Sequence, residues 1–264
     1  MITKQKLDRL YRKYNRRKYV SPDPLQFLYD YTDVRDREIV GLIASSLAYG
    51  RVAQILRSVE TVLEPMGPSP RAFLMRSRPR QVKGILAPFK HRFTAGDGLA
   101  SLLAGIKRLV TRHGSLNQAF LSGMQKSDSS ILPALKSFAN RLNCSDSHLV
   151  PCPSRGSACK RLNLFLRWMV RKDAVDPGGW TGVPKSRLIV PLDTHMANIG
   201  RTLGLTHRRS ADMKMAIEIT ESFRKLAPRD PAKYDFALTR FGIRSDMEMR
   251  DLLGEEQHFP VNSG

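Results

Sequence analysis

Residues 155–170 read R-G-S-A-C-K-R-L-N-L-F-L-R-W-M-V, and this stretch is the most informative part of the chain for predicting the fold. Gly156 is followed two positions later by Ala158 and two further on by Lys160, the spacing of a tight turn that leads into a helix. Apolar residues then recur three and four positions apart, as Leu162, Phe165, Leu166 and Met169. The stretch therefore predicts a turn and then an amphipathic helix over 158–171, with the lysine at their junction.

The same helical spacing continues along most of the chain, and strand-like alternation is nearly absent. The run Arg187–Pro191 is too short to build a sheet. We expect further helices over 3–18, 36–48, 52–63, 70–77, 80–87, 99–112, 116–121, 131–142, 194–203, 212–225 and 230–241. The predicted fold class is all-α.

The overall composition is typical of a soluble globular protein, because 41% of the 264 residues are hydrophobic and 26% are charged. No stretch approaches about 18 consecutive apolar residues, so we expect no membrane span. The first residues, M-I-T-K-Q-K-L-D, lack an apolar signal core and a small-residue cleavage site. This favours a cytoplasmic location, associated with the nucleoid if the source is bacterial.

Net charge is the strongest compositional signal, because 44 Lys and Arg against 24 Asp and Glu give +20. Such an excess repels itself unless a polyanion neutralises it. The basic residues also cluster: eight lie in 1–20, seven without an acid in 65–96, and six between Asp146 and Asp173. Clusters of this kind favour a phosphate-backbone partner. A merely basic surface and an anionic membrane surface are the alternatives.

Three cysteines, Cys144, Cys152 and Cys159, lie within sixteen positions. Their spacing matches no zinc signature, and a fourth ligand is missing unless His148 supplies it. We therefore expect free thiols, with no metal and no cofactor.

Lys160 is the candidate nucleophile. Small residues at 156 and 158 let backbone N–H groups approach a phosphate, and the start of a helix favours that anion. The helix dipole and the basic surroundings disfavour the charged form of an amine at this place. A neutral amine is what a Schiff-base nucleophile requires. The alternative is a lysine that is solvated or only contacts phosphate.

Asp193 is the candidate acid partner, 33 positions after Lys160 and directly behind the apolar run 188–192. One role open to it is the N-cap of the helix over 194–203. A carboxylate that also faces a cleft could stabilise an oxocarbenium-like sugar or accept a proton from an amine. His195, two positions on, is either a base-pocket group or a local hydrogen-bonding residue.

Both stretches resemble motifs of a known DNA-repair superfamily. R-G-S-A-C-K-R-L at 155–162 resembles the helix-hairpin-helix lysine motif L-P-G-V-G-x-K-T-A of the HhH-GPD DNA glycosylases, typified by endonuclease III. P-L-D-T-H-M-A-N-I-G-R-T-L-G-L at 191–205 looks like the V-D-T-H-V-x-R-V-x-x-R-L motif of the same superfamily.

Two further segments extend the resemblance across about 200 residues. E-I-V-G-L-I-A-S-S-L-A-Y-G-R at 38–51 stands where the superfamily has an early apolar helix and the loop that wedges into DNA. Y-D-F-A-L-T-R-F-G at 234–242 resembles its closing helix. The full pattern also looks like the bacterial family DUF2400, which carries the run G-S-A-C-K-R-L-N-x-F-L-R-W-M-V-R.

The chain departs from the glycosylase pattern at several points. Arg155 stands for the usual proline, and Ala158 for the usual second glycine. No cysteine follows Gly242, so the iron–sulfur cluster of endonuclease III is not expected. The long spacing between the lysine and the aspartate is similar to that of archaeal 8-oxoguanine glycosylases, which makes 176–180 a candidate base-pocket or lid element. An ordinary surface excursion is the alternative.

The resemblance implies two helical lobes with a helix-hairpin-helix motif at the cleft between them. One lobe would span 20–172, and the other would combine 1–19 with 173–264. It also implies a monomeric DNA glycosylase with AP-lyase activity, which flips a damaged base, such as the oxidised purine 8-oxoguanine, out of duplex DNA.

Roles of single residues follow from the same resemblance. Lys160 would attack C1′ of the sugar, and Asp193 would support departure of the base and deprotonate the amine. The expected DNA contacts are Gly156, Ser157, Ala158 and Arg161 on the phosphate backbone, and Tyr49, Gly50 and Arg51 as the wedge. Trp168, Trp180 and His195 are base-pocket candidates, although Trp168 lies on an apolar helix face, where a core role is the alternative.

Two other functions stay open at this point. The same fold could serve a non-catalytic binder of DNA or RNA, in which Lys160 contacts phosphate and Asp193 is only a helix cap. An RNA-directed enzyme is the other.

Overall fold

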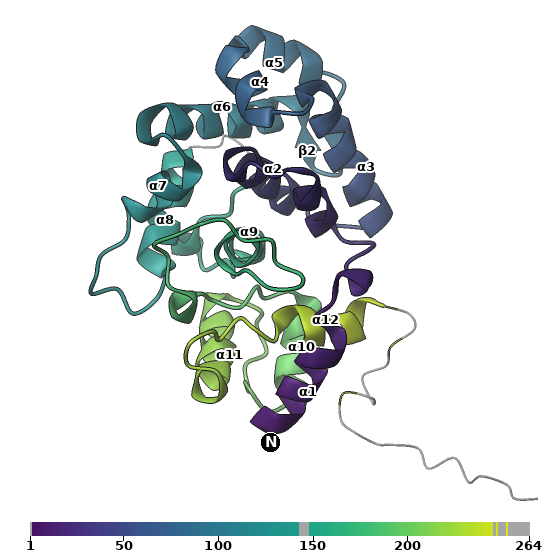
Figure 1. The fold of residues 1–264 in the computed structure, drawn as a ribbon, viewed down its shortest axis with the longest axis vertical. Coiled ribbons are helices and arrows are strands. Elements are labelled where there is room, and N and C mark those ends of the chain that lie inside the picture. The colour runs from purple at the N-terminus through teal and green to yellow at the C-terminus, as the bar shows by residue number, and fades with distance from the viewer. Residues whose placement is uncertain (1, 143–147, 245–246, 248–251, 253–264) are drawn as a thin grey trace, which may run out of the picture.

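The computed structural model describes residues 2–142, 148–244, 247 and 252 (Figure 1). Its α-helices are α1 (Lys4–Tyr14), α2 (Val34–Ser46), α3 (Val52–Leu63), α4 (Pro70–Arg76), α5 (Pro79–Leu86), α6 (Gly96–His113), α7 (Leu116–Leu121), α8 (Leu132–Leu142), α9 (Lys160–Val170), α10 (Thr194–Thr202), α11 (Met213–Leu226) and α12 (Asp235–Ile243). The prediction of a helical fold is confirmed for this part of the chain.

Short elements connect the helices. The 3-10 turns are η1 (Arg17–Tyr19), η2 (Pro24–Asp30), η3 (Glu64–Met66), η4 (Pro153–Arg155) and η5 (Lys185–Arg187). Strands β1 (Lys90–His91) and β2 (Thr94–Ala95) form an antiparallel hairpin in which His91 pairs with Thr94. Neither this hairpin nor η2 was expected from the sequence, because elements this short show no periodic pattern.

Several predicted helix boundaries differ from the structure by two to five residues, among them the starts of α2, α6 and α12. Two of the differences have clear local reasons. The first helix ends at Tyr14 rather than at residue 18, and Asn15 follows it as the cap. Helix α9 begins at Lys160 rather than at Ala158, because Cys159 has a left-handed φ of 48° and cannot continue a right-handed helix. The lysine is therefore the first helical residue.

Helix α9 is the central element (Figure 1). It packs against α2 on one side, while α10 and α12 pack against each other below it in this view. Phe165, Trp168 and Met169 are fully buried, and they belong to one hydrophobic cluster that runs from Leu7 to Leu252. The division into lobes at residue 172 stays a prediction, since the helices before and after it share this cluster.

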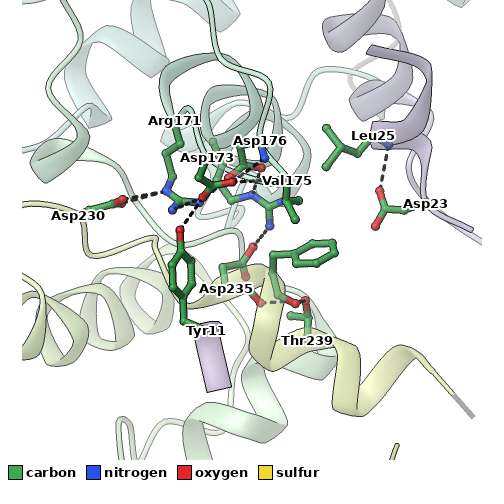
Figure 2. Close-up of polar contacts among 12 residues, drawn as sticks. Tyr11, Asp23, Leu25, Arg171, Asp173, Val175, Asp176, Asp230, Asp235 and Thr239 are labelled. Carbon is green, nitrogen blue, oxygen red and sulfur yellow. Dashed lines mark hydrogen bonds and ion pairs between the residues drawn. The ribbon is translucent and has the colours of Figure 1, made fainter. Parts of the chain in front are cut away.

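A buried ionic network fixes the C-terminal half of α9 (Figure 2). Arg167 bonds to Asp176 and Asp235, and Arg171 bonds to Asp173, Asp176 and Asp230. Both guanidinium groups are almost fully buried, and burial of such charges is tolerated only when partners and hydrogen bonds compensate them. The network thus ties α9 to the segment after it, to the segment before α12, and to α12.

A second buried carboxylate, Glu38 of α2, holds two distant segments. It accepts hydrogen bonds from the backbone N–H groups of Leu116 and Asn117 (2.7 and 3.0 Å) at the start of α7, and from the indole N–H of Trp180 (2.8 Å). Burial raises the pKa of Glu38 to about 7, although these hydrogen bonds oppose the rise. The segment over 175–184 is thereby fastened to the core.

Candidate functional site

The two residues singled out in the sequence meet in the structure. The Nζ atom of Lys160 lies 3.4 Å from Oδ2 of Asp193, and the side chains are 33% and 19% exposed. An amine and a carboxylate from different helices are thus paired where solvent, and hence a ligand, can reach them. The 32 residues between them form the rest of α9 and the segment after it, which returns the aspartate to the N-terminal end of α9.

The turn before α9 places the lysine. Gly156 adopts a left-handed φ of 77°, and a Cβ atom added there would meet nothing within 4 Å, so the backbone is open on that side. The Ser157 hydroxyl accepts from the backbone N–H of Cys159 (3.2 Å), and the Asn163 amide donates to the carbonyl of Ala158 (3.1 Å). The backbone N–H of Met213 in α11 donates to the carbonyl of Gly156 (3.3 Å). Local and distant contacts therefore hold the turn.

Asp193 has two tasks at once. It is the N-cap of α10, because its Oδ1 accepts from the backbone N–H of Met196 (2.8 Å), and its Oδ2 is the oxygen that faces Lys160. The extended segment before it is buried and bonded to α11 through the Thr220 hydroxyl and the Val190 N–H (3.0 Å). The capping role that the sequence left open is therefore real, and it fixes the carboxylate that the lysine meets.

The starts of α9 and α3 share a feature that matters for anion binding. Seven helical elements, from α1 to α11, have a capping side chain: Thr3, Asp23, Asp33, Ser69, Ser115, Asp193 and Asp212. Helices α9 and α3 begin after Cys159 and Arg51 without a side-chain cap, as do α6 and α12. The first N–H groups of a helix need acceptors, and an anion is a good one. Of the residues expected to contact DNA, 156–158 precede the start of α9 and 49–51 precede that of α3, whereas Arg161 lies within α9.

The segment Tyr49–Arg51 is built into the hairpin of β1 and β2. The Tyr49 hydroxyl lies 2.9 Å from the carbonyl of His91 and 2.8 Å from Oγ1 of Thr94. The Tyr49 ring meets the rings of His91 and His148 edge-on, with centroids 4.5 and 4.6 Å apart. Tyr49 therefore supports the hairpin, whereas Gly50 and Arg51 are exposed.

Arg161 connects the two parts of the candidate site. Its guanidinium donates to the carbonyl of Ser46 (3.1 Å) and to that of His148, and it lies over the Tyr49 ring at 4.9 Å. Several of its donors are thus used inside the protein, so its first role is to hold the Tyr49 segment against α9. Contact with phosphate stays a prediction for this residue.

The structure reveals an exposed aromatic residue that the sequence did not single out. Phe93 is 75% exposed at the tip of the β1–β2 hairpin, beside Arg92, whose φ is 52°. Its ring lies 5.6 Å from that of His148, which also contacts Tyr49. The hairpin and the Tyr49 segment thus form one surface. A lone phenylalanine between an arginine and a threonine gives no periodic signal, so only a hairpin prediction could have located it.

The two tryptophans lie in the core and not on an open surface, which corrects their proposed role as base-stacking residues. Trp168 is 0% exposed, as the core alternative requires. Trp180 is 5% exposed, and its ring packs on those of Phe120 and Phe165 at 5.7 and 5.1 Å. The segment over 175–184 places Trp180 in the core, where the buried Glu38 carboxylate accepts a hydrogen bond from its indole N–H. The segment 176–180 is accordingly a core anchor rather than a free surface excursion.

His195, the third base-pocket candidate, packs against the closing helix. A Cβ atom added at Gly242 would lie 2.5 Å from its Nδ1, so the ring sits directly on α12. Its side chain is half-buried and stands in the first turn of α10, two positions after Asp193. Within the part of the chain that the structure describes, no hydrogen bond joins it to Lys160 or Asp193, and its role in a base pocket stays a prediction.

Asp235 stands behind the exposed pair and was not anticipated. It is 2% exposed at the start of α12, bonds Arg167 through Oδ2, and leaves its buried Oδ1 without a hydrogen-bond partner. Burial raises the pKa of Asp235 to about 6; Arg167 opposes the rise, and the charge of Asp193 adds to it. The field at the site therefore has a contribution from a second, titratable carboxylate.

The cysteines give no metal centre in the part of the chain that the structure describes. Cys152 and Cys159 are free thiols, and burial raises the pKa of Cys159 to about 11. Cys144 lies outside the described residues. Among the residues described, no group of three or more His, Cys, Asp or Glu side chains could hold a metal ion. None of the described helices is long and apolar enough to cross a membrane.

Comparison with known proteins gives one match. The family model described as "Protein of unknown function (DUF2400)" matches residues 23–244, which include α2 to α12 and both members of the exposed pair. No curated protein and no solved structure matches the chain.

Proposed function

The chain belongs to the DUF2400 family, and we propose that it is a DNA glycosylase with AP-lyase activity whose nucleophile is Lys160. The main support for the proposal is the pairing of Lys160 with Asp193 at 3.4 Å, with both side chains partly open to solvent, on a protein with a net charge of +20. An ion pair that solvent can reach contributes little to stability by itself. A nucleophile beside its proton acceptor needs this arrangement.

Asp193 takes a proton from the Lys160 ammonium group, and the neutral amine attacks C1′ of an extruded nucleotide. The bond from C1′ to the base breaks, and the base leaves with the bonding electrons and takes up the proton that Asp193 carries. The bond from C1′ to the ring oxygen O4′ then breaks as Nζ loses a proton and O4′ gains one, which gives an imine between Nζ and C1′.

The lyase step follows from that imine. A base removes a proton from C2′, and the bond between C3′ and the 3′ phosphate oxygen breaks as the electrons move. The phosphate leaves as the anion, and water hydrolyses the imine to release the amine. Asp193 is already paired with the lysine, so it is the residue that returns a proton to the released Lys160 amine.

Backbone binding would use the uncapped helix starts and the basic surface. The first backbone N–H groups of α9 have no side-chain cap, and the backbone is open at Gly156, just before them. These N–H groups would therefore donate to a phosphate that approaches the start of the helix. The start of α3, directly after Gly50 and Arg51, also has no side-chain cap and would bind a second phosphate in the same way. Because these interactions read the backbone rather than the sequence, we expect binding that weakens steeply with salt.

Phe93 is our candidate for the wedge that unstacks the duplex. Apolar side chains that enter a base step do so from a position exposed to solvent, and this ring is 75% exposed. The Tyr49 hydroxyl and the His148 ring hold the hairpin that carries it. Arg51 and Arg92, both exposed, would contact the flanking phosphates or fill the space left by the flipped base.

The test is reductive trapping on a panel of duplexes that carry 8-oxoguanine, oxidised pyrimidines, uracil or an abasic site. In borohydride the wild-type protein should form a covalent complex with at least one duplex, whereas Lys160→Gln should form none while binding DNA nearly as well. Lys225→Gln, an exposed lysine on α11, is the matched control and should trap normally. A trapped complex of undiminished yield in Lys160→Gln would refute the nucleophile assignment.

One observation favours the second candidate, a non-catalytic nucleic-acid binder. Asp193 already caps α10, so part of its presence is explained without chemistry. Cleavage of no duplex or RNA substrate, alongside salt-dependent binding to all of them, would favour that function.

A further inference from the structure

A cavity of about 780 Å³ lies between α4, α5 and α6, at the end of the molecule away from α10 and α12 (Figure 1). Its lining includes Leu74, Val82, Ala100 and Leu103, which are 1–8% exposed. Ligand pockets in proteins commonly have volumes of roughly 300–1,000 Å³ and mainly apolar walls. Neither Lys160 nor Asp193 lines this cavity, so it is a separate site.

Fixed contacts hold α4, α5 and α6 in place around the cavity, so the cavity is preformed. At one place α5 and α6 touch through the backbone, since a Cβ atom at Gly96 would lie 1.9 Å from the carbonyl oxygen of Leu86. At another, Lys107 of α6 donates to the carbonyls of Met75 and Ser77 (3.1 and 2.7 Å) at the end of α4. A rigid pocket loses little entropy when a ligand enters.

The charged residues around the cavity indicate the sign of the ligand. Lys83 comes from α5, and Lys107, Arg108 and Arg112 come from α6, whereas Asp97 is the one acid among the lining residues. The pair between Lys83 and Asp97, at 3.4 Å, is largely exposed and therefore weak. The cations stand on two walls, so they suit several anionic groups spaced along a ligand rather than a single head group.

The apolar floor limits what can bind. Its residues are nearly buried, so a ligand that fills the cavity must bring an apolar group to them. A nucleic-acid backbone could pair with the cations but would leave the apolar floor empty. A chain that carries carboxylates and ends in an apolar anchor satisfies both parts.

We propose that this cavity between α4, α5 and α6, called the groove from here on, binds a short acidic peptide of a partner protein, with an apolar side chain as its anchor. The carboxylates pair with Lys83, Arg112 and the remaining donor capacity of Lys107, and the anchor contacts Leu74, Val82 and Leu103. This proposal does not rest on the proposed glycosylase activity.

The experiment uses the full chain and fluorescence anisotropy. The probe is a fluorescein-labelled peptide with the sequence Gly-Asp-Glu-Asp-Asp-Leu-Phe and a free terminal carboxylate. One control peptide replaces the last two residues by serine, and another replaces the acids by their amides. We expect saturable binding of the probe that falls at least about fivefold with either control peptide and weakens with salt.

Two variants locate the binding. Ala104→Trp adds a large ring from an exposed position in the lining of the groove, and the double variant Lys83→Glu, Arg112→Glu reverses charge at its rim. Each of the two variants should lower the affinity for the probe peptide by at least about fivefold. The matched double variant Lys225→Glu, Arg229→Glu changes the same charge on an exposed part of the chain that does not line the groove, and should keep most of the affinity.

Thermal unfolding and DNA trapping of each variant serve as controls for folding and for the other site. Wild-type trapping yield in the groove variants, together with lost peptide binding, separates the two sites. The proposal is overturned by the absence of saturable binding, by equal loss in the matched double variant, or by unchanged affinity in both groove variants. Decanoate that binds the groove while the peptide does not would also overturn it, in favour of an acyl-chain ligand.

Discussion

The two carboxylate oxygens of Asp193 have different partners: Oδ1 caps α10 through the backbone N–H of Met196, and Oδ2 lies 3.4 Å from Nζ of Lys160. The cap fixes the direction of the carboxylate, because its first oxygen is bound to the backbone. The second oxygen is then presented to an amine that begins another helix. The capping role and the proposed proton transfer can be separated by substitution, since the cap needs an acceptor and the proton transfer would need a charge.

Substitution of Asp193 should therefore have different effects on stability and on activity. Asp193→Asn retains an oxygen for the cap, so the free energy of unfolding should change by less than about 0.5 kcal/mol, whereas Asp193→Ala should lose about 1 kcal/mol. Both variants should lose most of the trapping rate, because neither can take the proton from Lys160. Chemical denaturation and single-turnover trapping give the two values. Full activity in Asp193→Asn would leave the residue with the capping role alone.

Replacing Phe93 should affect DNA and leave the fold intact. The side chain is 75% exposed, so Phe93→Ala should not lower the melting temperature measurably. Incision of a lesion in duplex DNA should fall at least about tenfold, while an unpaired single-stranded substrate should be less affected, because only the duplex must be unstacked. Ile85→Ala, at an exposed apolar residue elsewhere, is the matched control. Equal losses on both substrates would argue against a wedge.

The ionic network of Figure 2 should be costly to break from one side. Arg171→Met removes the partner of Asp173, Asp176 and Asp230 and leaves carboxylates uncompensated around a buried position. We expect a loss of about 3–5 kcal/mol in the free energy of unfolding. Arg224→Met, in an exposed pair with Glu221, should cost less than about 1 kcal/mol. Comparable losses in urea denaturation would show that the network contributes no more than a surface pair.

Stability should depend on pH through Glu38. Its pKa is raised to about 7 in the folded protein, from an ordinary value near 4.5. A raised carboxyl pKa stabilises the fold fully below the unfolded value, and this contribution is lost as pH rises through the folded value. Relative to Glu38→Gln, which cannot titrate, the wild type should therefore lose up to about 3 kcal/mol between pH 4.5 and 7.5. A constant difference between the two proteins over that range would contradict the shift.

The sequence indicated the helices well where the apolar spacing is long and regular. The bounds of α3 and α7 agree with those expected, and the turn before Lys160 begins at the glycine that suggested it. The pairing of Lys160 with Asp193 was also expected, although only because of the resemblance. Periodicity alone could not bring together two residues 33 positions apart.

What the sequence missed depends on partners far along the chain. Trp180 is buried because Glu38, 142 positions earlier, accepts its indole N–H, and no local pattern contains that information. Arg161 donates a hydrogen bond to the carbonyl of Ser46, 115 positions away, and the local sequence gives no sign of this contact. Phe93 is exposed because a two-residue strand on each side makes a hairpin, and strands this short show no alternation.

In the proposed reaction the amine of Lys160 becomes covalently joined to a sugar carbon. The direct measurement is tandem mass spectrometry of the borohydride-trapped complex after digestion of protein and DNA. We predict a reduced sugar adduct on Nζ of Lys160, which is present in the wild type and strongly reduced in yield after Asp193→Ala. An adduct on the N-terminal amine or on another lysine, with Lys160 unmodified, would contradict it.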